Sequence, residues 1–127
     1  MKYLLDVNVL LAWHHGPHQH YSRFHVWMTR VDPRDLATCA ITELGFVRIS
    51  MGAFGYSRSD ALTALAAMRR TCGEFIGELP AVANLPSWGN RHDETTDGYL
   101  CRLAAKNGLR LATFDTRIKD PAAMVIP

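Results

Sequence analysis

The sequence has few cysteines and no long apolar run, and both absences narrow what the protein can be. Its three cysteines, Cys39, Cys72 and Cys101, are odd in number and form no C-x-x-C unit. This argues against a disulfide framework and fits a reducing cytosol. No stretch approaches the about 18 apolar residues that a membrane-spanning helix needs. Asp6 and Asn8 interrupt the apolar start, so we interpret it as a strand and a helix, and we expect a cytoplasmic protein.

The chain also lacks a dense patch of either charge. Lysine and arginine number 14 against 12 acidic residues, which gives a net charge of +2 with the basic residues scattered. Such a balance permits nucleic-acid binding without arguing for it. The length of 127 residues fits one domain with one core, and no repeat, low-complexity segment or linker divides it. We therefore predict a single domain over residues 1–127.

Short apolar runs alternate with amphipathic segments along the chain. The patterns predict strands over residues 2–6, 36–39, 74–79, 109–114 and 124–126, and helices over 7–13, 18–31, 40–49, a segment ending near 70, and a segment ending at 106. Ser57 or Ser59 and Thr95 or Thr96 are the expected N-caps, and residues 50–56 are expected to form a Gly-rich loop. Asn107-Gly108 suits a helix C-terminus. This alternation predicts an α/β fold with a mostly parallel sheet.

Four acidic residues lie where the predicted structure changes. Asp6 and Asp115 end apolar runs, whereas Glu43 and Asp97 begin helical patterns. Strand ends and helix starts of a parallel α/β fold meet at the rim where open sheets bind ligands. We therefore expect the four carboxylates to converge. Converging carboxylates raise one another's pKa unless a divalent cation neutralises them, and oxygen ligands of this kind suit Mg²⁺ or Mn²⁺.

This acidic cluster predicts a metal-assisted reaction at a phosphate. We expect the metal to be held by Asp6, Asp97 and Asp115, so that a bound water attacks the phosphate while the cation stabilises the developing charge. The sequence leaves open whether one or two ions bind. Asn8 and Thr113 each lie two residues from an aspartate and are candidates to hydrogen-bond a carboxylate or a metal-bound water. Each acid taken alone can also serve as a cap or a first-turn acid.

The four acidic segments resemble the PIN-domain nucleases, and most closely the VapC-type toxins of bacterial toxin–antitoxin pairs. The resemblance rests on Leu4–Ala12, Thr42–Arg48, Thr96–Leu100 and Leu111–Asp115, and it covers nearly the whole chain. It implies a three-layer α/β/α sandwich and a Mg²⁺- or Mn²⁺-dependent endoribonuclease that uses the four acids. It also implies a homodimer and a small antitoxin that covers the active-site groove.

Two further features remain open at the level of sequence. Arg48 lies five residues after Glu43, which makes it a candidate contact for an RNA phosphate. A histidine cluster spans residues 14–25 and consists of His14, His15, His18, His20 and His25. A transition-metal site is conceivable there, but Gly16-Pro17 disrupts the helical spacing, and a half-exposed loop is the favoured interpretation. Contact with RNA near Asp6 is an intermediate possibility.

Three other functions are compatible with parts of the pattern. A phosphatase or phospho-acceptor domain would use Asp6 as nucleophile, but Asp6-Val7-Asn8 lacks a second acid two residues on. A non-catalytic binding module would not need four intact acids. A housekeeping RNA-processing nuclease of the same fold can barely be distinguished from a toxin by sequence. The sequence also does not show which RNA is the target.

Overall fold

The computed structural model describes residues 1–127 and contains five strands and five α-helices. In chain order these are β1 (Tyr3–Leu5), α1 (Val7–His14), α2 (Tyr21–Met28), β2 (Leu36–Cys39), α3 (Ala40–Ala53), α4 (Arg58–Thr71), β3 (Glu74–Ile76), α5 (Thr95–Lys106), β4 (Arg110–Thr113) and β5 (Ala123–Val125). Single 3₁₀ turns precede β2 and α5. None of the helices is long and apolar enough to cross a membrane.

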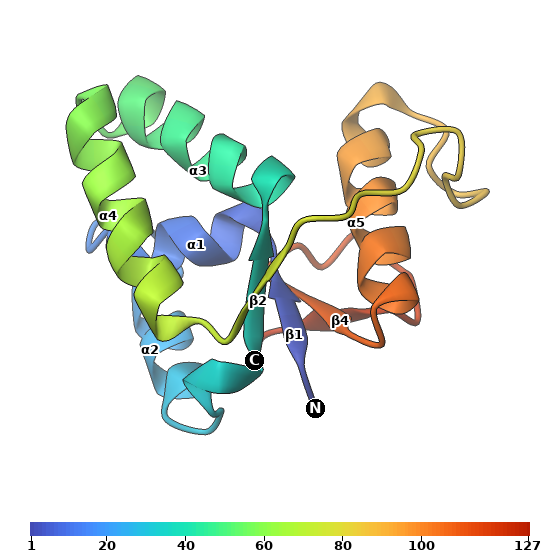
Figure 1. Ribbon diagram of the computed structural model, residues 1–127, viewed down its shortest axis with the longest axis horizontal. Coiled ribbons are helices and arrows are strands. Elements are labelled where there is room, and N and C mark those ends of the chain that lie inside the picture. Colours follow the sequence, from blue (N-terminus) through green and yellow to red (C-terminus); the bar gives the residue numbers. More distant parts are fainter.

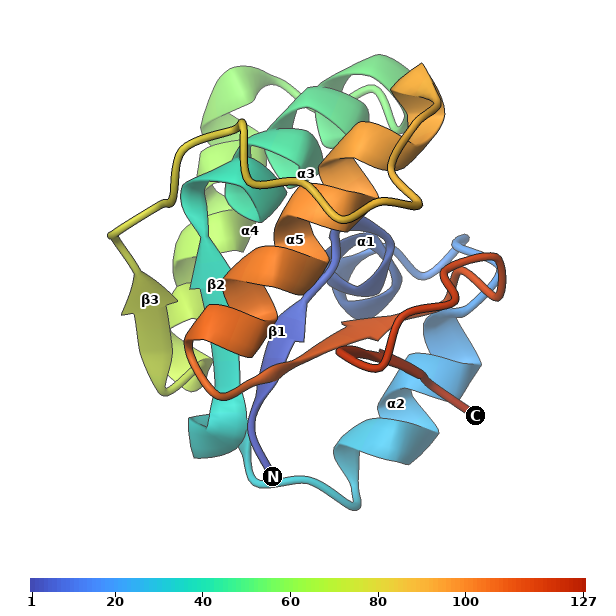
Figure 2. The same cartoon turned by 90° about the vertical axis from the view of Figure 1, so that its right-hand side faces the viewer.

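The five strands form one parallel sheet in the order β3-β2-β1-β4-β5. Helices α1 to α4 cover one face of this sheet and α5 covers the other, which makes three layers (Figure 1). The view from the side shows α5 lying across the sheet in front of β1 and β2 (Figure 2). The predicted α/β/α sandwich is confirmed. The chain builds the sheet outward from β1 on one side and then returns to add β4 on the other, so the strand order reverses between β1 and β4.

Two apolar clusters fill the spaces between the layers. The larger lies under α1 to α4 and includes Leu5, Phe24 and Phe46, whereas the smaller lies under α5 and includes Leu4 and Leu103. All five side chains are fully buried. Successive residues of β1 therefore face opposite cores, as the period of two in a strand requires. A central strand buried on both faces holds its C-terminal end in a fixed place, and that end carries Asp6.

The contact between α1 and α3 depends on the absence of a side chain at Gly45. A Cβ atom built on Gly45 would lie 2.6 Å from Cγ2 of Val7, closer than any ordinary contact. Only glycine lets the second turn of α3 approach the first turn of α1 this closely. Because Val7 directly follows Asp6 in the chain, this contact brings the N-terminal ends of both helices to the same rim of the sheet.

Several predicted boundaries differ from the structure. The expected loop over residues 50–56 was wrong in its first half, because α3 continues to Ala53 and the amide of Phe54 still donates to the carbonyl of Ser50. The helix expected over 18–31 is shorter, at Tyr21–Met28. Ser57 caps α4 as predicted, but neither expected threonine caps α5, where Glu94 occupies the N-cap position. Gly108 ends α5 in the left-handed conformation, with φ +68°.

Candidate active site

Asp6 stands at the point where β1 ends and α1 begins. Its Oδ1 accepts a hydrogen bond from the amide of Val7 at 2.7 Å, and its extended backbone makes it the N-cap of α1. The side chain is almost fully buried, with 5% of the residue exposed. Burial raises the pKa of this carboxyl, while the hydrogen bonds from Thr113 and Val7 lower it in part. The capping role and a place in the acidic site are thus compatible, since only one oxygen serves the cap.

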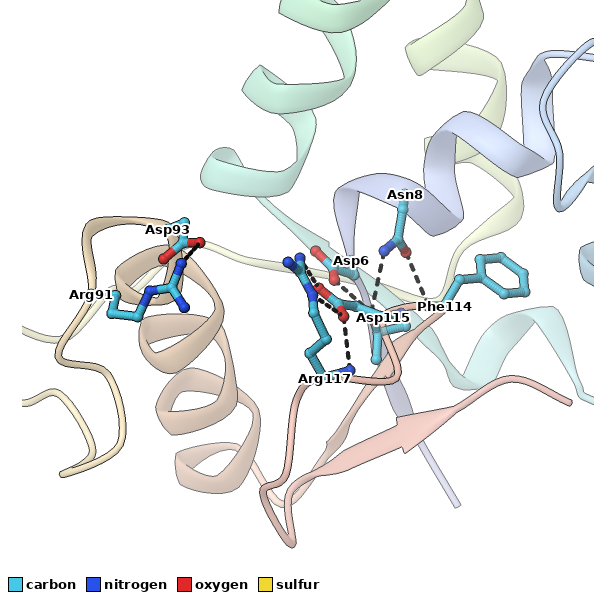
Figure 3. Close-up of polar contacts among 8 residues, drawn as sticks. Asp6, Asn8, Arg91, Asp93, Phe114, Asp115 and Arg117 are labelled. Carbon is cyan, nitrogen blue, oxygen red and sulfur yellow. Dashed lines mark hydrogen bonds and ion pairs between the residues drawn. The ribbon is translucent and has the colours of Figure 1, made fainter.

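The hydroxyl of Thr113 connects the ends of β1 and β4. It donates to Oδ2 of Asp6 at 2.8 Å and accepts hydrogen bonds from the side-chain amide of Asn8 at 3.3 Å and from the backbone of Asp115 at 3.0 Å. Asn8 in turn accepts from the amide of Phe114 at 3.2 Å. Figure 3 shows this network between the first turn of α1 and the loop after β4. The two residues expected to support the acids therefore lie against Asp6 and Asp115.

Asp97 and Asp115 complete a cluster of three aspartates with Asp6. Asp97 comes from the first turn of α5, and Asp115 follows β4. The pKa of Asp97 rises to about 6, first because the carboxyl is partly buried and then because Asp6 and Asp115 are negative. No hydrogen bond or ion pair holds the Asp97 carboxylate. Three carboxylates from distant parts of the chain thus meet where the strand order reverses, which is where open α/β sheets bind ligands.

Arginine side chains border this cluster, and sequence reasoning did not single them out. Arg117 forms a bidentate pair with Asp115, with Nε 3.0 Å from Oδ1 and Nη2 2.9 Å from Oδ2, and it lowers the pKa of that carboxyl. Arg91 pairs with Asp93 at 3.0 Å (Figure 3). A polar cavity at this place is lined by Trp88, Arg91, Asp93, Glu94, Asp97, Asp115, Arg117 and Ile118. The spacing Asp-x-Arg at residues 115–117 was the available signal for the first of these pairs.

Glu43 and Arg48 are both on α3. The carboxylate of Glu43 accepts a hydrogen bond from Thr38 at 2.6 Å and pairs with Arg69 of α4 at 3.2 Å. No hydrogen bond or ion pair joins it to the three aspartates, so its place among the four expected acids stays a prediction. Arg48 is exposed, forms no ion pair and does not line the cavity at the aspartates.

The chain is similar in sequence to several known proteins over most of its length. No family model matches the chain. Ribonuclease VapC39 of Mycobacterium tuberculosis is 37% identical over 134 residues, which cover 97% of this chain and 95% of the relative. Ribonucleases VapC38 and VapC44 of the same organism are 33% and 36% identical, over 91% and 93% of this chain. The chain belongs to the VapC ribonuclease family. The resemblance drawn from the four sequence segments is confirmed.

The donor set of this VapC-family chain fits a divalent cation. All three aspartates offer carboxylate oxygens, the ligands that Mg²⁺ and Mn²⁺ prefer. A cation would also relieve the repulsion that raises the pKa of Asp97. In this conformation no three acidic, histidine or cysteine side chains are arranged to hold a metal ion, and Arg117 pairs with Asp115. The residues therefore fit the metal by their chemistry, while Arg117 occupies the Asp115 carboxylate in this conformation.

Proposed function

We propose that this chain is the toxin of a toxin–antitoxin pair and acts as a divalent-metal-dependent endoribonuclease. The observation that carries the proposal is the cluster of Asp6, Asp97 and Asp115 in a chain whose relatives are named ribonucleases. Clustered carboxylates beside arginines suit a phosphodiester substrate, because a cation and the arginines together offset its charge. A cytoplasmic location is part of the proposal, because the RNA substrate is found there.

The chain's own residues divide the work at this site. Asp6, Asp97 and Asp115 would hold Mg²⁺ or Mn²⁺, which supplies a Lewis acid and lowers the pKa of water when bound. The hydrogen bonds of Thr113 and Asn8 hold Asp6 and the loop after β4 in fixed positions relative to each other. Arg117 and Arg91 stand at the cavity wall, where guanidinium groups can bind phosphate oxygens in bidentate fashion. Arg48 remains a proposed RNA contact outside the cavity at the aspartates.

Glu43 is proposed to act on the site through α3. Its carboxylate joins Thr38 of β2 and Arg69 of α4, so it fixes the first turn of α3 at the rim. This contact supports a positioning role for Glu43 in preference to direct contact with the substrate. The cleavage activity of a Glu43→Gln protein tests whether the side chain is needed.

The hydrogen bonds of Asp6 argue against the phospho-acceptor alternative. One oxygen accepts from Val7 and the other from Thr113, and the residue is 5% exposed. A nucleophilic aspartate needs an oxygen free to attack phosphorus. Each oxygen keeps a lone pair for a small cation, whereas attack on a phosphate needs an open approach that the burial of Asp6 restricts.

Two partners belong to the proposal. The first is a small antitoxin that blocks the site, and the second is another copy of this chain. Exposed apolar side chains support the homodimer: Leu44 is 69% and Val82 is 70% exposed. Val82 also lines a hollow with Ile41, which precedes Leu44 by one turn of α3. Sedimentation of wild type beside Leu44→Glu tests the dimer, since a charge there would separate the copies.

The decisive experiment combines growth with RNA sequencing. Wild type and Asp97→Asn are induced in cells, and cleaved RNA ends are sequenced. We expect growth arrest and discrete new ends in wild type alone. Purified wild type should cleave the same RNA with Mg²⁺ or Mn²⁺ and stop when EDTA is added. Equal growth with no new ends in either strain would remove the toxin assignment, and cleavage that persists in EDTA would remove the metal.

A further inference from the structure

The loop between α1 and α2 lies beside the aspartate cluster through one aromatic contact. Phe114 stands between Thr113 and Asp115, and Figure 3 shows its ring directed away from the carboxylates. The imidazole of His20 stacks on this ring, with centroids 4.5 Å apart and planes 15° from parallel. The guanidinium of Arg23 lies 5.1 Å from the same ring. His20 is therefore fixed on the flank of the site rather than inside it.

Hydrogen bonds determine the tautomer of both histidines in this loop. Nδ1 of His20 lies 3.1 Å from Nη1 of Arg23, and a guanidinium can only donate. Nδ1 of His18 accepts the backbone amide of His20 at 3.1 Å. Each ring must therefore leave Nδ1 unprotonated and carry its proton on Nε2. Partial burial lowers the pKa of both imidazoles, and His20 and Arg23 respectively lower it further, so both rings stay neutral at pH 7.

The free Nε2 atoms distinguish these two histidines from the rest of the cluster. Nε2 of His14 bonds to Tyr56, Nε2 of His15 to Ser50, and Nε2 of His25 to the carbonyl of Trp13, at 2.8 to 3.0 Å. In those three rings Nε2 is therefore already used within the protein. Nε2 of His18 and Nε2 of His20 have no partner in the protein, and the two rings lie 5.7 Å apart. Two oriented N–H donors beside Arg23 are thus left for an external acceptor.

We propose that His18 and His20 form an RNA-binding subsite flanking the aspartates, in which each Nε2–H donates to a phosphate oxygen of the strand next to the cleaved bond. The inference rests on the proposed ribonuclease function and names residues that this function does not otherwise use. In nucleic-acid complexes most hydrogen bonds from the protein go to the phosphate and sugar backbone. Such contacts fix the position of the nucleic acid on the protein without reading its sequence. Neutral donors release no counterions, so they should not change the salt dependence of binding.

The test measures RNA binding and cleavage by loop variants. Dissociation constants for a target RNA are measured by fluorescence anisotropy in an Asp97→Asn background, which binds without cleaving. We expect His18→Ala and His20→Ala each to weaken binding by about three- to tenfold, as the loss of one hydrogen bond implies. Glutamine keeps an N–H donor near the position of Nε2, so His18→Gln and His20→Gln should recover part of the affinity.

Gln19 provides the matched control, because it lies between the two histidines and is exposed without a hydrogen bond. Gln19→Ala should bind like the parent. With Asp97 intact, the alanine variants should raise KM and leave kcat unchanged, because the lost contact is equal in ground and transition state. The slope of log affinity against log salt should match that of the parent.

The outcomes separate this inference from the function on which it rests. Wild type that neither binds nor cleaves RNA overturns the ribonuclease proposal. Wild type that cleaves, beside His18→Ala and His20→Ala proteins that bind like Gln19→Ala, overturns the subsite alone. Nitrogen-15 spectra of the folded Asp97→Asn protein, taken during titration with RNA, guard against a variant that fails to fold. The Nε2 signals of His18 and His20 should shift while those of His15 and His25 stay in place, and the reverse pattern also overturns the subsite.

Discussion

The hydroxyl of Thr113 donates to Oδ2 of Asp6 at 2.8 Å across the junction of β4 and β1. This bond joins residues that are 107 positions apart in the chain. It also crosses the point where the strand order reverses, so it ties the two halves of the sheet together at the proposed site. Its loss should affect the acid and the fold together, and the two effects can be measured separately.

We expect Thr113→Val to impair cleavage by about 10- to 100-fold, the usual effect of removing a group that supports a metal-binding carboxylate. The variant also removes the bonds of the hydroxyl to Oδ2 of Asp6, to the side-chain amide of Asn8 and to the backbone amide of Asp115, which should lower the free energy of unfolding by about 1–3 kcal/mol. Thr113→Ser keeps the hydroxyl and is the control. Urea unfolding and a cleavage assay check both effects, and a serine variant as impaired as the valine variant would contradict the role of the hydroxyl.

The raised pKa of Asp97 predicts a pH dependence of stability in metal-free protein. Its value of about 6, against 3.8 for the unperturbed group, means that the native state binds more protons than the unfolded state between those pH values. The contribution is therefore favourable below about pH 4 and is lost as the pH rises through 6. Asp97→Asn should be more stable than wild type by about 1 kcal/mol at pH 7.5, after allowing for partial exposure, and by less at pH 5.

The comparison must be made between variants because His15 titrates with the opposite sign. Burial lowers the pKa of His15 from 6.5 to about 4, so that its contribution is lost as the pH falls through this range. Both proteins share this effect, and the difference between their melting temperatures in EDTA removes it. Mg²⁺ should then stabilise wild type at pH 7.5 and leave Asp97→Asn unchanged. A difference that stays constant from pH 5 to 7.5 would sink the prediction.

The fold and the neighbouring positions of Asp6, Asp97 and Asp115 followed from local patterns in the sequence. Asp6 and Asp115 each end a strand, and the parallel arrangement of strands brings those ends to one edge. The contacts of Glu43 with Thr38 and Arg69 could not be predicted in this way, because a position in a first turn leaves the rotation of the helix undetermined. The packing of Gly45 on Val7 and the approach of Arg69 determine that rotation, and both are tertiary contacts.

The loops account for the remaining differences between prediction and structure. In the sequence Arg117 is one of many scattered basic residues. In the structure the turn after β4 brings its side chain onto Asp115. The extra turn of α3 contains Ser50, whose side chain bonds to the buried ring of His15. That bond joins residues that are 35 positions apart, so no local sequence pattern could predict it.

Gly45→Ala should destabilise the protein by about 1–3 kcal/mol, because the new Cβ would lie 2.6 Å from Cγ2 of Val7. The same substitution in a Val7→Ala background should cost less, since the obstructing methyl groups are gone. Gly52→Ala is the matched control on the same helix. No atom lies within 4 Å of a Cβ there, so helix propensity should make that change neutral or stabilising. Chemical denaturation measures wild type, the three single variants and the double variant, and equal effects at the two glycines would refute the close contact.

Glu43 and Arg69 should be energetically coupled across α3 and α4. A double-mutant cycle with Glu43→Gln and Arg69→Gln should give a coupling of about 1 kcal/mol, reduced from a buried value because the Arg69 side chain is 46% exposed. Arg69→Gln should keep cleavage activity while losing stability. Additive effects would mean that the ion pair contributes nothing, and cleavage abolished in Glu43→Gln alone would give Glu43 a direct part in the reaction.

Arg117 should compete with the proposed metal for Asp115. The pair is bidentate, but the Arg117 side chain is 79% exposed, so its release costs roughly 1 kcal/mol or less. We therefore expect Arg117→Gln to bind Mn²⁺ roughly two- to fivefold more tightly than wild type, and to bind RNA more weakly because a phosphate partner is lost. Calorimetry measures the first quantity and fluorescence anisotropy the second.

The chain contains a matched control for this competition. Arg34 pairs with Asp32 in the same Asp-x-Arg spacing, with Nη2 2.8 Å from Oδ2 and the same additional bond from the arginine backbone. Arg34 does not line the cavity at the aspartates. Arg34→Gln should therefore change neither affinity. If Mn²⁺ binds Arg117→Gln and Arg34→Gln equally well, Asp115 does not exchange its arginine for the cation, and the metal would have to be held by Asp6 and Asp97 alone.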